Sequence, residues 1–254
     1  MLGNVLTGPL QHWFIMRPKK SRPETKYHFP DLFREVFLES GPGTKFHSLW
    51  FQTKNRPPRG VVLYLHGNAG SLERWGEIGP RFTQLGFDIL IPDYRGYGKS
   101  TGPQSEKAFY QDADSCWKFL EENYPKVPKI IFGRSIGSGP ACWLAAHTNP
   151  NGLILETPFP SMKKLFYSYY PFLPRLFFFR FTFSNIEYLK QCKMPILVFA
   201  GTRDWVVPFR CSKQLKTVLK PTDLFIAIPG GRHSHLNIFP EYKDNLEKWF
   251  QSVE

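Results

Sequence analysis

A serine set between glycines is the first feature of the chain with chemical meaning. Gly133, Ser135 and Gly137 form a G-x-S-x-G pattern directly after the apolar run KIIF. A strand-to-helix turn this tight strains the serine backbone and lifts its hydroxyl above the sheet, while the glycines let strand and helix approach closely. The pattern therefore predicts that Ser135 is a nucleophile. Ser138 is expected in the first turn of the following helix, where a small residue helps packing.

A serine hydroxyl needs a base to take its proton and a third group to hold that base. Asp204 follows the apolar run PILVFA, and His233 follows LFIAI within PGGRHSHLN, so both stand where predicted strands end. The order along the chain is serine, acid, histidine, and the two glycines before the histidine segment can aim it back at the turn. We predict a triad of Ser135, Asp204 and His233, with Glu156 as the alternative acid and His235 as the competing base.

The glycine-rich segment HGNAGS, residues 66–71, follows another apolar run. Acyl transfer passes through a tetrahedral intermediate whose oxyanion needs backbone N–H donors. One normally comes from the residue after the nucleophile and one from a loop like this one. We predict that the amides of Ile136 and Asn68 form the oxyanion hole. His66 is expected to order the loop by hydrogen bonding rather than to act as a base.

The segment DYRGYGKSTG, residues 93–102, raises the question of a phosphate-binding loop because it contains Gly98-Lys99-Ser100. A Walker A loop needs a further glycine five positions before Gly98, and Asp93 stands there. The sequence thus argues against a nucleotide site. It predicts a sharp turn beside the active site, in which Asp93 and Arg95 brace the loops.

The candidate residues follow short apolar runs with the length and composition of buried strands. These runs are residues 60–66, 87–92, 129–133, 152–156, 195–200 and 224–228. Helical patterns lie at residues 72–85, 107–123, 136–147, 208–219 and 241–252. The alternation predicts an α/β protein with a mostly parallel central sheet flanked by helices, and ligands bind at the carboxyl edge of such a sheet. Residues 34–40 and 45–51, on either side of Gly41-Pro42-Gly43, predict an antiparallel hairpin added at one edge.

One connection, residues 157–194, is too long to be a simple loop. Ten of the nineteen residues from 165 to 183 are aromatic, but prolines and arginines interrupt them, so the segment is well short of a membrane span. Two interpretations compete: the aromatic side chains fill a helix–sheet core, or they form a small lid whose apolar face lines a substrate pocket. Long insertions in compact α/β domains favour the lid.

Composition sets the broad class. The 254 residues are 42% hydrophobic and 21% charged, which predicts a single domain over residues 1–254 with an N-terminal arm over about 1–30. That arm is too interrupted for a membrane span or a secretory signal, so we expect a cytoplasmic protein with four free cysteines. The net charge of +12 would favour an anionic membrane surface, nucleic acid or acidic substrates, and charge alone does not choose among them. Without zinc-finger or RNP patterns we expect no nucleic-acid partner, and peripheral contact with an anionic membrane stays open.

Together, HGNAGS, DYRGYGKSTG, GRSIGSGP, GTRDWVVP and the late histidine turn resemble the α/β-hydrolase superfamily. Within it they are similar to the serine-hydrolase branch that includes protein depalmitoylases and lysophospholipid hydrolases. The resemblance covers roughly residues 34 to 250. It implies that Ser135 attacks an ester or thioester carbonyl, that His233 relays the proton, that Asp204 holds the imidazolium, and that water releases the acid. No cofactor or metal is implied.

We therefore expect a hydrolase of carboxylic esters or thioesters, acting on a small-molecule or lipid acyl substrate. A peptidase or amidase would use the same triad. A hydrolase-like binding protein without activity is the alternative from another class, because a fold alone does not prove activity.

Overall fold

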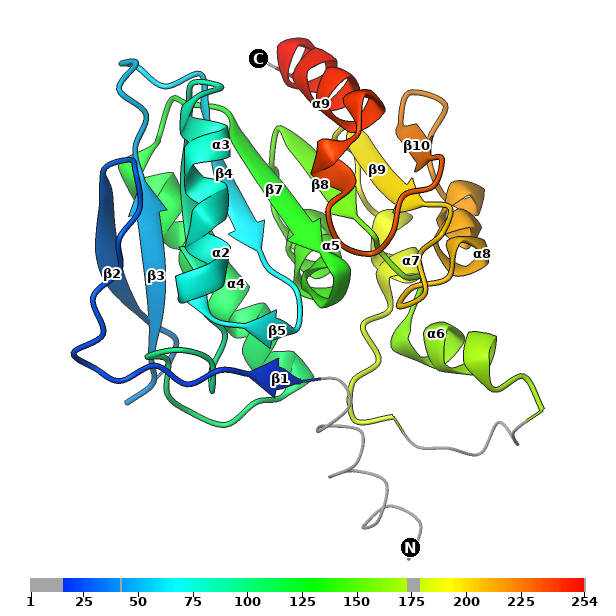
Figure 1. Cartoon of the computed structure of the whole chain (residues 1–254), viewed down its shortest axis with the longest axis horizontal. Helices are drawn as coiled ribbons and strands as arrows, with labels where there is room; N and C mark the ends of the chain where they lie inside the picture. Colours follow the sequence, from blue (N-terminus) through cyan, green and yellow to red (C-terminus); the bar gives the residue numbers. More distant parts are fainter. Residues whose placement is uncertain (1–15, 42, 173–178, 254) are drawn as a thin grey trace, which may run out of the picture.

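An eight-stranded sheet forms the centre of the molecule (Figure 1). The computed structural model describes residues 16–41, 43–172 and 179–253. The strand order is β10-β9-β8-β7-β4-β6-β3-β2. From β10 to β6 all neighbours are parallel, whereas β3 is antiparallel to both β6 and β2. The strands are β2 (Phe33–Glu39), β3 (Lys45–Phe51), β4 (Gly60–Leu65), β6 (Phe87–Pro92), β7 (Lys129–Arg134), β8 (Gly152–Glu156), β9 (Ile196–Gly201) and β10 (Leu224–Ile228).

The central strands are buried along their whole length, which explains their unbroken apolar sequences. Every residue of β4, β6, β8 and β9 is buried. Helices α4 (Glu106–Asn123), α5 (Ser138–His147) and α7 (Asn185–Leu189) contribute to the core on one face. On the other face lie α2 (Leu72–Trp75), α3 (Gly79–Thr83) and α9 (Pro240–Ser252). The predicted α/β class, parallel sheet and antiparallel edge hairpin are confirmed.

Three of the five helix predictions need correction. The expected helix over 72–85 is three short pieces, α2, the 3-10 turn η1 (Gly76–Ile78) and α3, because Gly76, Gly79 and Pro80 interrupt it. A side chain at Gly79 would come within 2.6 Å of the Phe51 ring, so this segment lies against the sheet as bare backbone. The expected helix over 208–219 is α8 (Phe209–Ser212) followed by η3 (Lys213–Thr217), and the one over 136–147 begins with η2 (Ser135–Gly137).

The long connection between β8 and β9 combines both interpretations of its aromatic residues. Helix α6 (Met162–Tyr169) projects beyond the carboxyl edge of the sheet, beside α8, and carries the exposed Tyr169 (Figure 1). Phe181 and Phe183 are instead fully buried in the core with α4 and α5. The returning part of the segment therefore fills the core, as the first interpretation expects, and the lid stays a prediction for α6. Phe177 and Phe178 lie outside the described residues.

The described part of the N-terminal segment lies beside the loop that follows β4. Strand β1 (Arg17–Pro18) pairs in parallel with β5 (Ala69–Gly70), and Met16 is buried in the core. About half of the predicted arm, residues 1–15, lies outside the described residues. None of the described helices has the length and apolar character that crossing a membrane requires. All four cysteines are free and buried, as expected.

Candidate active site

Ser135 stands at a strained turn between β7 and η2. Its φ of 52° lies in the left-handed region, which is costly for a residue with a side chain. The flanking glycines make the turn feasible. A side chain at Gly137 would overlap the carbonyl oxygen of Leu65, and one at Gly133 would come within 2.5 Å of Ala141 Cβ. The G-x-S-x-G spacing is thus a steric requirement of this turn.

Ser135, His233 and Asp204 come together although they are far apart in the chain. His233 Nε2 lies 3.0 Å from Ser135 Oγ, and His233 Nδ1 lies 2.8 Å from Asp204 Oδ2. A carboxylate only accepts hydrogen bonds, so Nδ1 carries the proton toward Asp204 and Nε2 is left to accept from the serine hydroxyl. The other carboxylate oxygen of Asp204 accepts the amides of Val206 and Val207, both at 2.8 Å. The acid is therefore fixed by its own loop.

The alternative acid and base lie elsewhere. Glu156 is buried and bonded to other partners: its Oε1 is 3.0 Å from Arg134 Nε, and its Oε2 accepts the Tyr242 hydroxyl at 2.8 Å. His235 is exposed and has a φ of 68° at the start of η4 (Leu236–Ile238). The structure brings neither of them to Ser135.

Arg134 is a functional candidate that the sequence analysis did not single out. Its Nη2 donates to the carbonyl oxygen of His233 at 3.3 Å, and its guanidinium lies 5.1 Å from the centre of the Trp75 ring. Burial has the largest single effect and would lower the pKa of Arg134, but the Glu156 carboxylate together with Tyr64 and Tyr242 outweighs it, and the net shift is upward. Arg134 therefore stays charged while buried. In the sequence it occupies a variable position of the pattern, and only a charge at the end of a buried strand hinted at this role.

The segment expected to supply the second oxyanion donor passes directly beside the nucleophile. A side chain at Gly67 would lie 3.8 Å from Ser135 Cβ. The next residue, Asn68, is held by its carbonyl oxygen, which accepts the Arg17 amide at 3.1 Å and the Tyr97 hydroxyl at 2.8 Å. Ile136 is buried next to Ser135. Gly67 thus brings this loop beside Ser135, and the amides of Asn68 and Ile136 remain the predicted oxyanion hole.

His66 and Asp93 order this loop, as expected. His66 Nδ1 lies 2.7 Å from the Gly67 carbonyl oxygen, and its Nε2 lies 3.2 Å from Asp93 Oδ1. The other oxygen of Asp93 accepts the Leu72 amide at 3.1 Å. Both side chains are fully buried. His66 is thus committed to the loop and is not paired with Ser135.

Arg95 has a different position from the one predicted. Its Nε lies 2.9 Å from Asp112 in α4, and its Nη2 donates to the Ser40 carbonyl oxygen at 3.0 Å. It therefore joins α4 to the edge hairpin rather than bracing the catalytic loops. The reason is local: Gly96 has a φ of 85° and turns the chain directly after Arg95.

Ser138 has the structural role expected of it, and it also connects the turn to the long insertion. Its hydroxyl donates to the Ser135 carbonyl oxygen at 2.6 Å and accepts from Asn185 Nδ2 at 2.9 Å. Asn185, the first residue of α7, also donates to the Phe159 carbonyl oxygen at 2.9 Å. The backbone of the nucleophile is thus tied to both ends of the insertion that carries α6.

Helix α6 also contacts the loop that holds the acid. The Tyr169 hydroxyl donates to the carbonyl oxygens of Trp205 and, at 3.0 Å, of Val206. A hollow of about 480 Å³ lies here, lined by residues that include Tyr169, Asp204 and Trp205. Among the described residues, no group of three histidine, cysteine or carboxylate side chains could hold a metal ion.

A mostly parallel sheet, helices on both faces and a serine at a strained strand-to-helix turn define the α/β-hydrolase architecture. Comparison with known proteins agrees. The sequence profile of the family described as serine aminopeptidase, S33 matches residues 56–184. An uncharacterized protein of Mycobacterium tuberculosis is 30% identical over 203 residues, which cover 79% of this chain and 72% of that protein. The chain belongs to the α/β-hydrolase family.

Other relatives have named activities. The lysophosphatidylserine lipase ABHD12 of Mus musculus is 30% identical over 238 residues, which cover 81% of this chain but 59% of the lipase. An esterase of Pyrococcus furiosus superposes with a TM-score of 0.72 at 19% identity, over 94% of this chain and 98% of the esterase. An α/β hydrolase of Vibrio vulnificus has a TM-score of 0.67 at 25% identity, over 85% of this chain and 80% of its own.

Proposed function

We propose that this chain is a serine hydrolase that cleaves carboxylic esters or thioesters of acyl chains through an acyl-enzyme. One observation carries the proposal: Ser135, His233 and Asp204 form a continuous hydrogen-bonded array at 3.0 Å and 2.8 Å. The array begins at a strained serine that the turn presents at the carboxyl edge of the sheet. Nucleophile, base and orienting acid are thus within the reach that acyl transfer requires.

In the first half of the reaction, Ser135 Oγ attacks the carbonyl carbon while His233 Nε2 takes the hydroxyl proton. The resulting imidazolium is stabilised by Asp204, and the oxyanion by the amides of Ile136 and Asn68. Collapse of the tetrahedral intermediate breaks the bond to the alcohol or thiol, which leaves with the proton from His233. In the second half, water attacks the acyl-serine, again losing its proton to His233, and the carboxylic acid is released with Ser135 restored.

Two kinds of support favour ester chemistry. The relatives with named activities are a lipase and esterases. The hollow beside Asp204 is bordered by the side chains of Tyr169, Trp205, Pro208 and Phe209, which offer apolar surface to an acyl chain. We assign α6 and its connections, within residues 157–194, as the lid of that site. The acyl ester is a small molecule or a lipid.

Peptide or amide hydrolysis is the second candidate, because the matching family profile is described as a serine aminopeptidase. The same array would serve, with an amine as the leaving group. A binding protein without turnover is the alternative from another class. We assign the enzyme to the cytoplasm and to the surface of anionic membranes, to which its net charge of +12 draws it.

A substrate series separates these possibilities. The purified protein is assayed with p-nitrophenyl esters of increasing acyl length, matching thioesters, lysophospholipids and aminoacyl p-nitroanilides. We expect ester turnover to exceed anilide turnover and Ser135→Ala to reduce it by roughly 10³-fold or more. Ser138→Ala, the neighbouring serine, is the matched control and should keep turnover within about tenfold. Faster anilide turnover would favour the peptidase, and well-folded protein without any turnover would favour the binding protein.

A further inference from the structure

The positive charge of this protein is concentrated in one part of the chain. Residues 157–222 contain eleven lysines and arginines but only two acidic residues, so they carry +9 of the net charge of +12. Both acidic residues are engaged: Glu187 pairs with Lys190 at 2.8 Å, and Asp204 with His233 at 2.8 Å. This stretch supplies α6, the loop after β9 and α8, which lie together at one end of the molecule (Figure 1). Lys190 is paired with Glu187 and Lys220 with Asp223, but Lys163, Lys164 and Arg210 form no ion pair among the residues that the structure describes.

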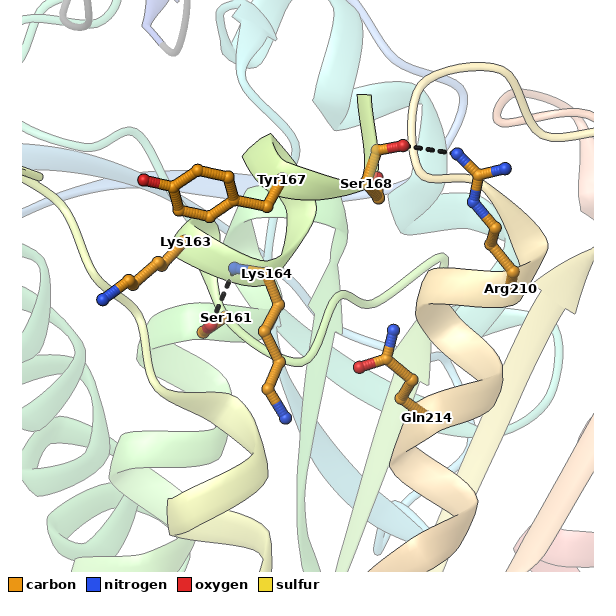
Figure 2. Close-up of a pocket in the computed structure, with 7 residues that line it drawn as sticks. All are labelled: Ser161, Lys163, Lys164, Tyr167, Ser168, Arg210 and Gln214. Atoms are coloured by element: carbon orange, nitrogen blue, oxygen red, sulfur yellow. Dashed lines mark hydrogen bonds between the residues drawn. The ribbon is translucent and has the colours of Figure 1, made fainter. Parts of the chain in front are cut away.

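A basic groove separates α6 from α8. It is a hollow of about 500 Å³ (Figure 2), and its lining contains three cations and no carboxylate: Ser161, Lys163, Lys164, Tyr167, Ser168, Arg210 and Gln214. Arg210 reaches across from α8 and donates to the Ser168 carbonyl oxygen. Lys163 and Lys164 project from the first turn of α6, and within the described part of the chain neither forms an ion pair. Two unneutralised ammonium groups and a guanidinium thus share one concave surface.

Large aromatic side chains are exposed next to this groove. Phe172 is 98% exposed and Trp205 83%, and Tyr170 is also more than half exposed. The Tyr169 hydroxyl connects the two segments by donating to the Trp205 carbonyl oxygen. Arg210 lines both the basic groove and the hollow beside Asp204, so the two hollows are neighbours. We call this surface, defined by Lys163, Lys164, Arg210, Tyr170, Phe172 and Trp205, the basic–aromatic face.

We propose that the basic–aromatic face docks the protein on the surface of an anionic lipid bilayer. Aromatic rings settle at the level of the lipid headgroups, where the apolar bodies of Tyr170, Phe172 and Trp205 leave water and the polar atoms of the tyrosine and the tryptophan keep hydrogen-bond partners. Lysines and arginines beside them are attracted by the negative surface potential of anionic lipids. The basic–aromatic face combines exposed aromatic rings with cations. It lacks carboxylates, which an anionic membrane would repel.

Docking in this way places the candidate active site at the lipid surface. Trp205 directly follows Asp204 in the chain, and both residues line the hollow that Arg210 also borders. A lipid ester would then meet the protein on the side where the acid of the candidate triad lies. The docking deepens the membrane location given in the proposed function, and this last consequence also rests on the proposed ester hydrolysis, whereas the docking needs only charge and exposed aromatic surface.

Sedimentation with vesicles tests the docking without any need for turnover. The full chain is mixed with phosphatidylcholine vesicles, either pure or containing about a third phosphatidylserine. We expect binding to the anionic vesicles that weakens at high salt and little binding to the neutral ones. Lys163→Gln/Lys164→Gln should weaken anionic binding about 30-fold, since each lysine is worth roughly a factor of five. Phe172→Ser should weaken it further.

The control variant removes the same charge elsewhere. Lys126 and Lys248 are exposed and lie at the opposite edge of the sheet, so Lys126→Gln/Lys248→Gln should bind anionic vesicles within about twofold of the wild type. Ser135→Ala should also bind normally, which separates docking from catalysis. Equal binding to neutral and anionic vesicles, or equal losses in the two lysine pairs, would overturn the proposal. So would binding of an oligonucleotide, but not vesicles, through Lys163 and Lys164.

Discussion

The side chain of Arg134, the residue directly before Ser135, donates a hydrogen bond to the carbonyl oxygen of His233 at 3.3 Å. The nucleophile turn and the histidine loop are therefore joined by a second connection besides the contact between Ser135 and His233. The buried Glu156 carboxylate holds the Arg134 guanidinium at 3.0 Å, and the Tyr242 hydroxyl holds Glu156. A buried ion pair thus positions the loop of the base relative to the nucleophile.

Removing the guanidinium should disturb both stability and alignment. We expect Arg134→Met to lose about 3 kcal/mol of unfolding free energy, because it leaves the buried Glu156 charge uncompensated. It should also lower kcat about tenfold with KM nearly unchanged, because His233 is less well held. The double variant Arg134→Met/Glu156→Gln is the control. It should recover part of the stability but not the lost kcat, and full recovery of kcat would mean that Arg134 has only a structural role.

The two candidate acids, Asp204 and Glu156, should differ in what their substitution affects: kcat for Asp204 and the free energy of unfolding for Glu156. Asp204→Asn should reduce kcat for a soluble ester by roughly 10³-fold or more, because the amide no longer holds His233 Nδ1–H in the productive tautomer. Glu156→Gln should keep kcat within about tenfold while lowering the unfolding free energy. Steady-state kinetics and urea unfolding of both variants measure this. The assignment of the acid would be wrong if the larger kinetic loss followed Glu156→Gln.

The sequence predicts those parts of the site that follow directly from the order of the strands in the sheet. Ser135, Asp204 and His233 each follow a strand of a parallel sheet, and parallel strands end at one edge, so their meeting follows from their order alone. The Arg134–Glu156 pair follows the same logic, because β7 and β8 are neighbours with these residues in register. It escaped the sequence analysis because Glu156 had a competing interpretation as the acid. The contacts in the structure distinguish the two candidate acids: Asp204 Oδ2 lies 2.8 Å from His233 Nδ1, whereas Glu156 pairs with Arg134.

The insertion shows where local pattern is insufficient. Phe166 and Phe181 are the same kind of residue within one aromatic stretch, but Phe181 is fully buried under α4 whereas Phe166 lies partly exposed on α6. Which side a ring takes is decided by tertiary contacts such as Asn185 to Ser138, which direct the returning chain across α5. Similarly, the break in the helix over 72–85 depends on how closely Gly79 approaches Phe51.

The cysteines give a prediction about pH. Burial raises the pKa of Cys192 and Cys211 to about 11, and those of Cys116 and Cys142 well above the ordinary value. In the unfolded chain the thiols ionise from near pH 9, so the cysteines' contribution to the free energy of unfolding should be constant below that pH and should fall as pH rises from 9 toward 11. Denaturant unfolding at several pH values measures this.

Alkylation provides the matching chemical test. Native protein at pH 8 should react slowly with iodoacetamide at all four cysteines, because the thiolate is the reactive form and burial disfavours it. Denatured protein should be labelled at all four. The variant Cys192→Ala/Cys211→Ala should show a weaker loss of stability above pH 9. Rapid labelling of any of the four cysteines in the folded protein would contradict their burial.

The most direct test of the central claim, that Ser135 is an activated nucleophile, is labelling with a fluorophosphonate followed by peptide mapping. The reagent forms a covalent bond only with a serine whose proton is taken by a base. We predict one label per chain, on the peptide that contains Ser135, with no label on Ser135→Ala and full labelling of Ser138→Ala. Folded protein that remains unlabelled, or that carries its label on another residue, would contradict the account.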